Sequence, residues 1–352
     1  MTGARGRMTA LTREAVAAID RAGMLDDVLQ QHAQLEDALW RAESARVPSS
    51  QAGGGLVVAG MGGSAIGGDL AAGIAGERAA APIRTVRGYG LPPWLPADSL
   101  VLCASYSGDT EETVSCFEAA GELGAARAVV TTGGELAQRA RSEAVPVIGV
   151  PSGMRPRAAV AYMTVAALEC AAACGAAPAL RGEVGAASAL LSELAGEWGP
   201  DAPDESEAKA LARRLHDTVP IVYGAGATAP VARRWETQLN ENPQIQAFAS
   251  ELPEADHNEI CGYDSPEARF AAVFLDDPAL DPRVRRRIEL TAEVIAPGAA
   301  AVEHVEPRGE TPAERVLSLV LLGDLVSIYL SALLGVDPSP MEPIERLKEL
   351  LR

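Results

Sequence analysis

Short runs of aliphatic and β-branched residues alternate with longer segments of helical period along most of the chain. An amphipathic helical stretch comes first, at residues 11–45, and is broken near Gly23. In the first half the strand runs begin at Leu56, Pro82, Ser99, Ala126 and Val145, and the helical stretches cover 64–76, 109–123, 135–144 and Arg157 to about Cys174. Strands that recur with helices between them predict βαβ units and a parallel sheet covered on both faces.

The alternation resumes after a change of composition at residues 176–208, where helix formers are followed by a stretch rich in Gly, Pro and acidic residues. Strand runs then begin at Pro220, Arg269 and Ala299, and helices are expected up to about Asn240, over 282–296 and over 311–334. Each half opens with a strand, a glycine turn and a helix, which indicates a duplicated α/β fold. We therefore predict an N-terminal helical segment, a first domain, a connection, and a second domain with a C-terminal helix, at residues 1–50, 51–178, 179–210 and 211–352.

Composition narrows the class of protein. The chain of 352 residues has 30 Lys and Arg against 48 Asp and Glu, so its formal charge of −18 disfavours nucleic acids and anionic membranes as partners. Aromatic residues make up only 4%, which argues against a base-stacking surface. Glu169 and Asp324 interrupt the two apolar stretches at 158–180 and 316–334, so we expect buried helices there, with no membrane span.

Cysteine and histidine usage bears on compartment and cofactors. Five cysteines without CxxC spacing fit a reducing, cytoplasmic environment better than a disulfide framework. The four histidines are scattered along the chain, so no zinc cluster is expected and we predict no metal.

Two glycine turns, at residues 60–65 and 224–229, match the GxGxxA pattern of dinucleotide-binding proteins. That class of site needs an acidic residue at the end of the next strand, where this chain has Arg84, Thr85 and Arg87. Only an NADP site would be compatible with these residues. The alternative is a glycine turn that simply lets a helix and a strand pack closely.

Hydroxyl side chains cluster after the third strand, in the segment Ser105-Tyr106-Ser107-Gly108-Asp109-Thr110. Hydroxyls at alternating positions before a helix start can surround an anion together with the free N–H groups of the helix terminus. Ser64, after the first strand, can add a further donor, because ligands bind off the carboxyl ends of parallel strands. We call Ser64, Ser105, Ser107 and Thr110 the hydroxyl cup. An ordinary N-cap with a capping box is the alternative.

Two other polar segments are candidates for chemistry. Arg155 and Arg157 follow the fifth strand run, where an arginine could face an anionic group. In the second half, Glu241 lies in an Asn-Glu-Asn sequence, and His257 ends a loop after a largely apolar segment. A carboxylate and an imidazole placed together could act as base and acid, although most such polar runs are solvated faces.

The ordered set of motifs resembles the bifunctional phosphoglucose/phosphomannose isomerases, two-domain members of the sugar isomerase (SIS) superfamily. The motifs span residues 60 to 348 in the order of that family: GMGGSAIGGD, RGYGLP, SYSGDTEET, PSGMRPRAAV, NEN, LPEADHNEI and DPSPMEPIERLK. The resemblance implies two SIS-type (flavodoxin-like) domains, each a parallel sheet flanked by helices. Two positions depart from the family pattern: Gln244 stands where a lysine is common, and Ser339 where a threonine is common.

The resemblance also implies roles for individual residues. The hydroxyl cup, with Gly62, Gly63 and Gly108 in the same turns, is expected to bind the phosphate of a hexose 6-phosphate. Glu241 is expected to be the base, His257 to open the sugar ring, and Arg157 and Lys348 to face the reacting end. Members of the family are homodimers in which the partner subunit supplies the histidine loop, and they need no metal or other cofactor.

Aldose–ketose isomerisation of fructose 6-phosphate, through a cis-enediol(ate), is the expected reaction. A carboxylate base, a ring-opening imidazole and a cation near the developing oxyanion are sufficient for it. A sensor that binds a sugar phosphate without turnover would use the same cup, because fold alone does not determine function.

Overall fold

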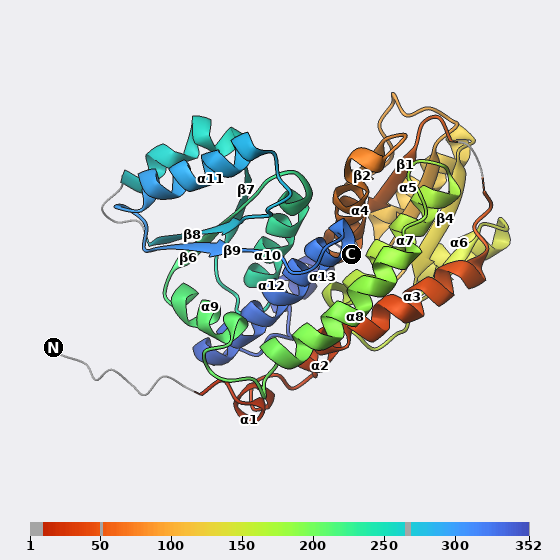
Figure 1. Ribbon diagram of the computed structural model, residues 1–352. Coiled ribbons are helices and arrows are strands. Elements are labelled where there is room, and N and C mark those ends of the chain that lie inside the picture. Colours follow the sequence, from red (N-terminus) through yellow and green to blue (C-terminus); the bar gives the residue numbers. More distant parts are fainter. Residues whose placement is uncertain (1–9, 50–51, 265–268, 352) are drawn as a thin grey trace.

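A computed structural model describes residues 10–49, 52–264 and 269–351. The domain limits predicted at residues 1, 50, 51 and 352 lie outside these ranges. Two parallel sheets, one from each half of the chain, lie side by side with long helices between them (Figure 1). The sequence prediction of an α/β fold with two parallel sheets is confirmed.

The first sheet has the strand order β2-β1-β3-β4-β5, and all neighbouring pairs are parallel. Its strands are β1 (Leu56–Gly60), β2 (Ile83–Val86), β3 (Leu100–Ala104), β4 (Ala126–Thr131) and β5 (Val147–Gly149). β1 and β3 are buried along their whole length, as expected for strands covered on both faces. The strand order changes direction between β1 and β3, and ligands of such sheets bind outside the carboxyl ends of the strands at this point.

Helices cover both faces of the first sheet. One face packs against α3 (Gln31–Ala45), α4 (Gly62–Ala75) and α7 (Val160–Ala173), and the other against α5 (Glu111–Leu123) and α6 (Gly134–Ser142). The N-terminal stretch is divided into α1 (Arg13–Ala17), α2 (Met24–Leu29) and α3, with a break at the left-handed Gly23. The predicted break near Gly23 is therefore confirmed.

The second sheet has the order β7-β6-β8-β9 and is also parallel. Its strands are β6 (Val219–Gly224), β7 (Phe248–Glu251), β8 (Phe270–Leu275) and β9 (Ala301–Val305). β7 is absent from the sequence prediction, which treated its residues as part of an apolar connecting segment. It is a short edge strand whose residues are all half-buried or exposed, so it lacks the buried run that reveals the other strands.

The second sheet is covered by α9 (Glu207–Leu215), α10 (Ala229–Glu241) and α12 (Pro312–Leu334) on one face and by α11 (Pro282–Ile295) on the other (Figure 1). Residues 181–198, in the predicted connection, form a long helix, α8 (Arg181–Trp198), which packs against α3 and α12. α12 is long and apolar enough to cross a membrane by composition, but nearly all of it is buried inside the protein. It is capped by Thr311, which forms a capping box with Glu314.

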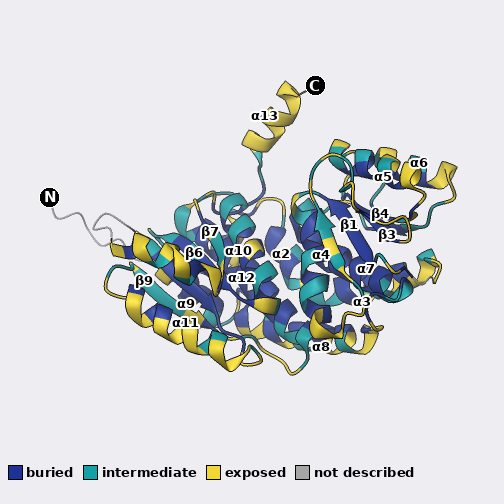
Figure 2. Ribbon diagram, turned by 90° about the horizontal axis from the view of Figure 1, so that it is seen from above, coloured by how far each residue is buried: buried dark blue, intermediate teal, exposed yellow. Residues whose placement is uncertain are grey.

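Short 3-10 helices complete the chain, and none of the five cysteines is in a disulfide. The 3-10 helices are η1 (Gly76–Arg78), η2 (Pro156–Ala159), η3 (Gly226–Thr228), η4 (Glu254–His257) and η5 (Glu259–Asp264). The last helix, α13 (Glu342–Leu350), projects from the body of the molecule, and most of its residues are exposed (Figure 2).

Candidate functional site

The hydroxyl cup lies where the strand order of the first sheet changes direction. Ser64 is in the first turn of α4, directly after β1, and Ser105 directly follows β3. The Ser105 and Thr110 hydroxyls are 2.9 Å apart, and the Ser64 Oγ accepts a hydrogen bond from the Tyr106 backbone N–H at 3.1 Å. Each serine that accepts a hydrogen bond keeps its own proton for another acceptor. The structure thus brings hydroxyls from two neighbouring turns to the edge where a ligand is expected.

The turn after β3 is folded around Ser105. Its Oγ accepts from the Gly108 N–H at 3.0 Å, and Ser107 Oγ accepts from the Asp109 N–H at 3.2 Å. Gly108 has a φ of +80°, and a Cβ there would lie 1.9 Å from the Gly133 carbonyl oxygen, so only glycine fits. Thr110 is the N-cap of α5, but its side chain makes no capping hydrogen bond. The alternative of an ordinary capping box at this turn is therefore wrong.

Tyr106 connects the cup to the loop that carries Arg157. Its hydroxyl donates to the Pro151 carbonyl at 3.1 Å and accepts from the Met154 N–H at 2.9 Å. Sequence reasoning gave Tyr106 no role, although it stands between the two serines of the motif.

Arg157 lies in η2 and is almost completely buried, with 2% of its surface exposed. The first glycine turn packs against its backbone: a Cβ on Gly63 would lie 3.0 Å from the Arg157 Cα. The guanidinium donates to the Asn242 Oδ1 at 2.7 Å, to the Met341 sulfur at 3.0 Å and to the Pro338 carbonyl. Arg157 therefore stands between the cup side of the first domain and residues from the second half of the chain.

Glu241, the last residue of α10, forms an ion pair with Arg157, with 3.2 Å between Oε2 and Nη1. Its side chain is 24% exposed, against 2% for the arginine side chain, so the carboxylate is the partner that a ligand can reach. Burial raises the pKa of Glu241, and the positive charges of Arg157 and Arg234 act in the opposite direction. A carboxylate that is reachable, paired with a cation and raised in pKa suits a general base.

His257 does not meet Glu241 within one chain. α10 ends at Glu241. β7 then runs parallel to β6, so that Glu251 pairs with Gly224 at the carboxyl end of both strands. His257 follows, as the last residue of η4. α10 has 13 residues and is about 20 Å long. The two residues therefore lie at opposite ends of the strands of the second sheet, Glu241 at the amino ends and His257 at the carboxyl ends. The residue pattern left open which subunit's histidine approaches Glu241, because β7, which separates the two residues within one chain, was not predicted.

His257 itself is exposed. Its neighbour Asp256 is fixed to α11, accepting from Thr291 Oγ1 at 2.7 Å and from Arg287 at 2.9 Å. The loop is thus held against α11 while the imidazole faces outward.

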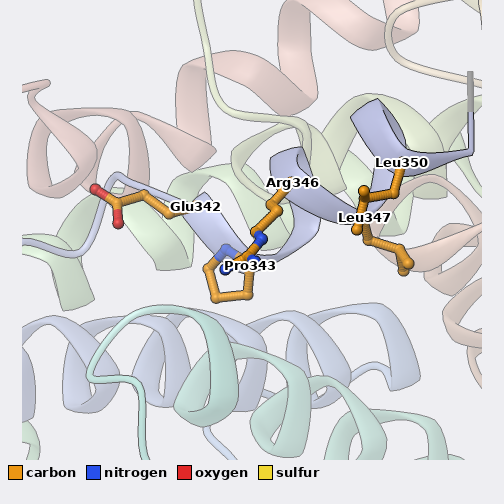
Figure 3. A pocket seen from close by; sticks show the side chains of 5 residues that line it. All are labelled: Glu342, Pro343, Arg346, Leu347 and Leu350. Atoms are coloured by element: carbon orange, nitrogen blue, oxygen red, sulfur yellow. The ribbon is translucent and has the colours of Figure 1, made fainter.

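Lys348 is also separate from Glu241, because it lies on the projecting α13 and is exposed. The helix nevertheless starts beside the site, since Met341 contacts Arg157. A hollow of about 400 Å³ runs along α13, and its lining comes from this helix alone (Figure 3). Apolar side chains at Ile344, Leu347 and Leu351 follow helical spacing and are 40–75% exposed.

The second glycine turn does not form a second cup. The Thr228 hydroxyl is occupied by the Ala225 backbone and by the Leu275 carbonyl at 3.2 Å, between the ends of β6 and β8. A cleft of about 1180 Å³ adjoins this turn. Three of its four arginines, at 78, 87 and 315, each pair with a carboxylate, and the fourth, Arg233, is exposed. The cup, Arg157 and Glu241 line neither this cleft nor the hollow on α13.

The structure also bears on the dinucleotide alternative. Arg87, which would have to hold a 2′-phosphate, pairs with Asp69, and the Arg84 guanidinium lies over the Trp94 ring at 4.8 Å. Both cations of β2 and its exit already have partners, which disfavours an NADP site. Among the residues that the structure describes, no group of three or more His, Cys, Asp or Glu side chains could hold a metal ion.

Comparisons with known proteins point to one family. Residues 204–351 match the bacterial phospho-glucose isomerase C-terminal SIS domain. The bifunctional phosphoglucose/phosphomannose isomerase of Caldicellulosiruptor bescii is 35% identical over 84% of this chain and 89% of its own length. The enzyme of the same name from Aquifex aeolicus is 35% identical over 85% of this chain and 90% of its own. The chain belongs to the bifunctional phosphoglucose/phosphomannose isomerase family.

The fold of this isomerase family member is also seen in solved structures. A hypothetical protein from Thermus thermophilus superimposes with a TM-score of 0.74, covering 97% of this chain and 93% of its own, at 17% identity. This likeness confirms the predicted arrangement of two domains with parallel sheets. Of the two departures from the family pattern, the buried Ser339 follows the Pro338 carbonyl that accepts from Arg157. Gln244, two residues after Asn242, is exposed and has a left-handed φ of +57°.

Proposed function

We propose that this isomerase family member interconverts fructose 6-phosphate with glucose 6-phosphate and with mannose 6-phosphate. The contact of Arg157 with Glu241 at 3.2 Å, beside the turn that carries Ser64, is the observation that carries the proposal. It joins an anion-binding cup in the first half of the chain to a base in the second half.

The cup residues hold the phosphate and so place the other end of the open-chain sugar at Glu241. Glu241 removes the proton from C2 of the aldose, and the electron pair forms the C1–C2 double bond of a cis-enediol(ate). The positive charge of Arg157 stabilises the oxyanion that develops at O1. The proton of the C2 hydroxyl then passes to O1, and Glu241 returns the carbon-bound proton to C1 as the C2 carbonyl forms, which gives the ketose. Glucose and mannose 6-phosphates differ only at C2, so both give the same intermediate.

Ring opening is assigned to His257 of a second copy, in a homodimer with shared sites. Two observations support this part of the proposal. In one chain, His257 and Glu241 lie at opposite ends of the strands of the second sheet. The apolar side chains of Ile344, Leu347 and Leu351 on α13, the helix that also carries Lys348, are exposed in the single chain. A partner subunit would cover them. The proposed site needs no metal, and a cytoplasmic location is expected.

The test is to incubate the purified protein with fructose 6-phosphate after chelation of metals and to measure both aldoses. We expect turnover to glucose and mannose 6-phosphates, and a loss of roughly 100- to 10,000-fold in kcat for Glu241→Gln, the range that a general base contributes. The matched control is Glu236→Gln, which neutralises a half-buried carboxylate on the same helix. Thermal stabilisation by hexose phosphate without turnover would instead support the sensor alternative.

A further inference from the structure

The longest helix that the structure describes, α12, is largely apolar but contains several completely buried polar residues. Asp324 and Ser327 are both 0% exposed and lie one turn apart. Ser327 donates to the Asp324 carbonyl at 2.7 Å, so its oxygen is left as an acceptor on the same face. Neither residue has a part in the proposed chemistry.

Asp324 acts on the backbone of Arg157 through Arg234. The Arg234 guanidinium donates to both Asp324 oxygens, at 3.0 and 2.6 Å, and also to the Arg157 carbonyl at 3.0 Å. Gln31 of α3 donates to Asp324 at 2.6 Å. Asp324 therefore fixes the guanidinium that holds the Arg157 main chain.

Ser327 acts on the side chain of Arg157 through Asn242. The Asn242 Nδ2 donates to the Ser327 Oγ at 2.8 Å, which directs its Oδ1 toward the Arg157 Nε at 2.7 Å. Asn242 is buried and directly follows the base Glu241. The orientation of the Asn242 amide thus determines the orientation of the Arg157 guanidinium group.

A stability role accounts poorly for this arrangement. Removing two charges from water costs several kcal/mol per ion, and apolar residues of similar volume often replace a buried ion pair with no loss of stability. The chains of contacts from Asp324 and Ser327 both end on one residue, Arg157, which contacts Glu241.

We infer that Asp324 and Ser327 of α12 are positioning residues, which hold Arg157 from its backbone and its side chain at once so that it faces Glu241 and the substrate. This inference rests on the proposed function. It adds residues that touch no substrate and act only through Arg234 and Asn242.

The first test compares Ser327→Ala with Ser331→Ala. Both remove a buried hydroxyl from α12, but Ser331 donates only to the Ser327 carbonyl. We expect Ser327→Ala to lower kcat by about tenfold or more with little change in KM, because misplacing a group near the reacting atoms is costly. The pKa on the acid side of the pH profile of kcat/KM should also rise, because a less firmly held Arg157 stabilises the Glu241 carboxylate less. Ser331→Ala should stay within about twofold of the wild type.

The second test removes the charges altogether, in the triple variant Gln31→Leu/Arg234→Met/Asp324→Leu. We expect a melting temperature close to that of the wild type and a kcat at least about tenfold lower. A stable triple variant with wild-type kcat and pH profile would overturn the inference. Equal changes in kcat in Ser327→Ala and Ser331→Ala would overturn the positioning role of Ser327, even if the triple variant fails to fold.

A crystal structure of Ser327→Ala separates this inference from the proposed function. We expect Arg157 to lose its contact with Asn242 or Glu241 in that structure, whatever reaction the protein catalyses. Unchanged contacts would contradict the inference, whereas an inactive wild type would contradict only the proposed function.

Discussion

Arg157 and Glu241 form an ion pair whose two side chains differ in burial, and this difference suits the proposed chemistry. The arginine side chain is 2% exposed and is held by three further acceptors, so it is fixed. The carboxylate is 24% exposed, with a pKa raised by burial and lowered in part by two arginines. A pair in which only the base faces outward can exchange protons with a ligand while the cation keeps its place.

Asp27 of α2 is a second carboxyl group whose environment opposes its charge. Burial, and next the charges of Asp20 and Asp26, raise its pKa from 3.8 to about 6. Because the folded state holds this proton more tightly than the unfolded chain, the stability that this group contributes is full below pH 3.8 and is lost as the pH rises to about 6.

Asp27→Asn should therefore stabilise the protein at neutral pH but not at pH 3.8. We expect a gain of about 1 kcal/mol in the free energy of unfolding, a figure reduced because the carboxyl is half-exposed. Denaturant unfolding at both pH values measures it. Asp26→Asn is the comparison. It removes a charge from an exposed position of the same helix and only the smallest of the three causes of the raised Asp27 pKa, so its gain should be clearly smaller. Equal gains for the two variants, or a gain that does not depend on pH, would refute this explanation.

At the scale of elements, the sequence predicts what depends on local patterns. The buried runs of β1 and β3 are unmistakable, and the hydroxyls that follow them could be assigned to one sheet edge because parallel strands end together. β7 could not be found in this way, because an edge strand of four half-buried or exposed residues has neither length nor a buried run. Without β7, the position of His257 relative to Glu241 within one chain could not be predicted.

The contacts around Arg157 were beyond local reasoning. Arg157 and Glu241 are 84 positions apart, and only the family resemblance linked them. Asn242 was noticed as a neighbour of the base, but its bond to Ser327 depends on how α10 packs against α12. Asp324 stood out as a charge in an apolar helix, yet its partner could not be read from spacing.

Close packing of α4 against Arg157 gives a prediction at the same scale. Gly63→Ala would put a Cβ 3.0 Å from the Arg157 Cα and 3.2 Å from its nitrogen, so this backbone must shift. We expect kcat to fall about tenfold or more. Steady-state kinetics measure it, with Gly73→Ala as control, whose Cβ would be similarly tight, 3.1 Å from the Ala227 oxygen, but away from Arg157. Similar loss of kcat in both variants would show that crowding of α4 alone is responsible.

At the scale of the whole molecule, the proposed function requires a second copy of the chain. Gly63, next to Ser64 of the cup, packs against Arg157, which contacts Glu241. His257 is exposed at the opposite end of the strands of the second sheet, and α13 projects with apolar residues exposed (Figure 2). A two-fold dimer would use one surface patch twice and complete two sites together.

Pairs of differently tagged chains test this sharing. A purified dimer of Glu241→Gln with His257→Ala should have one intact site and about half of the wild-type activity. A dimer of the wild-type chain with the Glu241→Gln/His257→Ala double variant should be inactive, because each site then lacks one residue. If sites are formed within one chain, the two results are reversed. A monomer in analytical ultracentrifugation would remove the proposal.

The most direct measurement of the central claim is deuterium incorporation by NMR during incubation of fructose 6-phosphate in D₂O. If Glu241 moves the proton between C1 and C2, solvent deuterium should appear at C2 of both aldose phosphates, and Glu241→Gln should abolish both exchange and isomerisation. Exchange and turnover at the wild-type rate in Glu241→Gln would contradict the account.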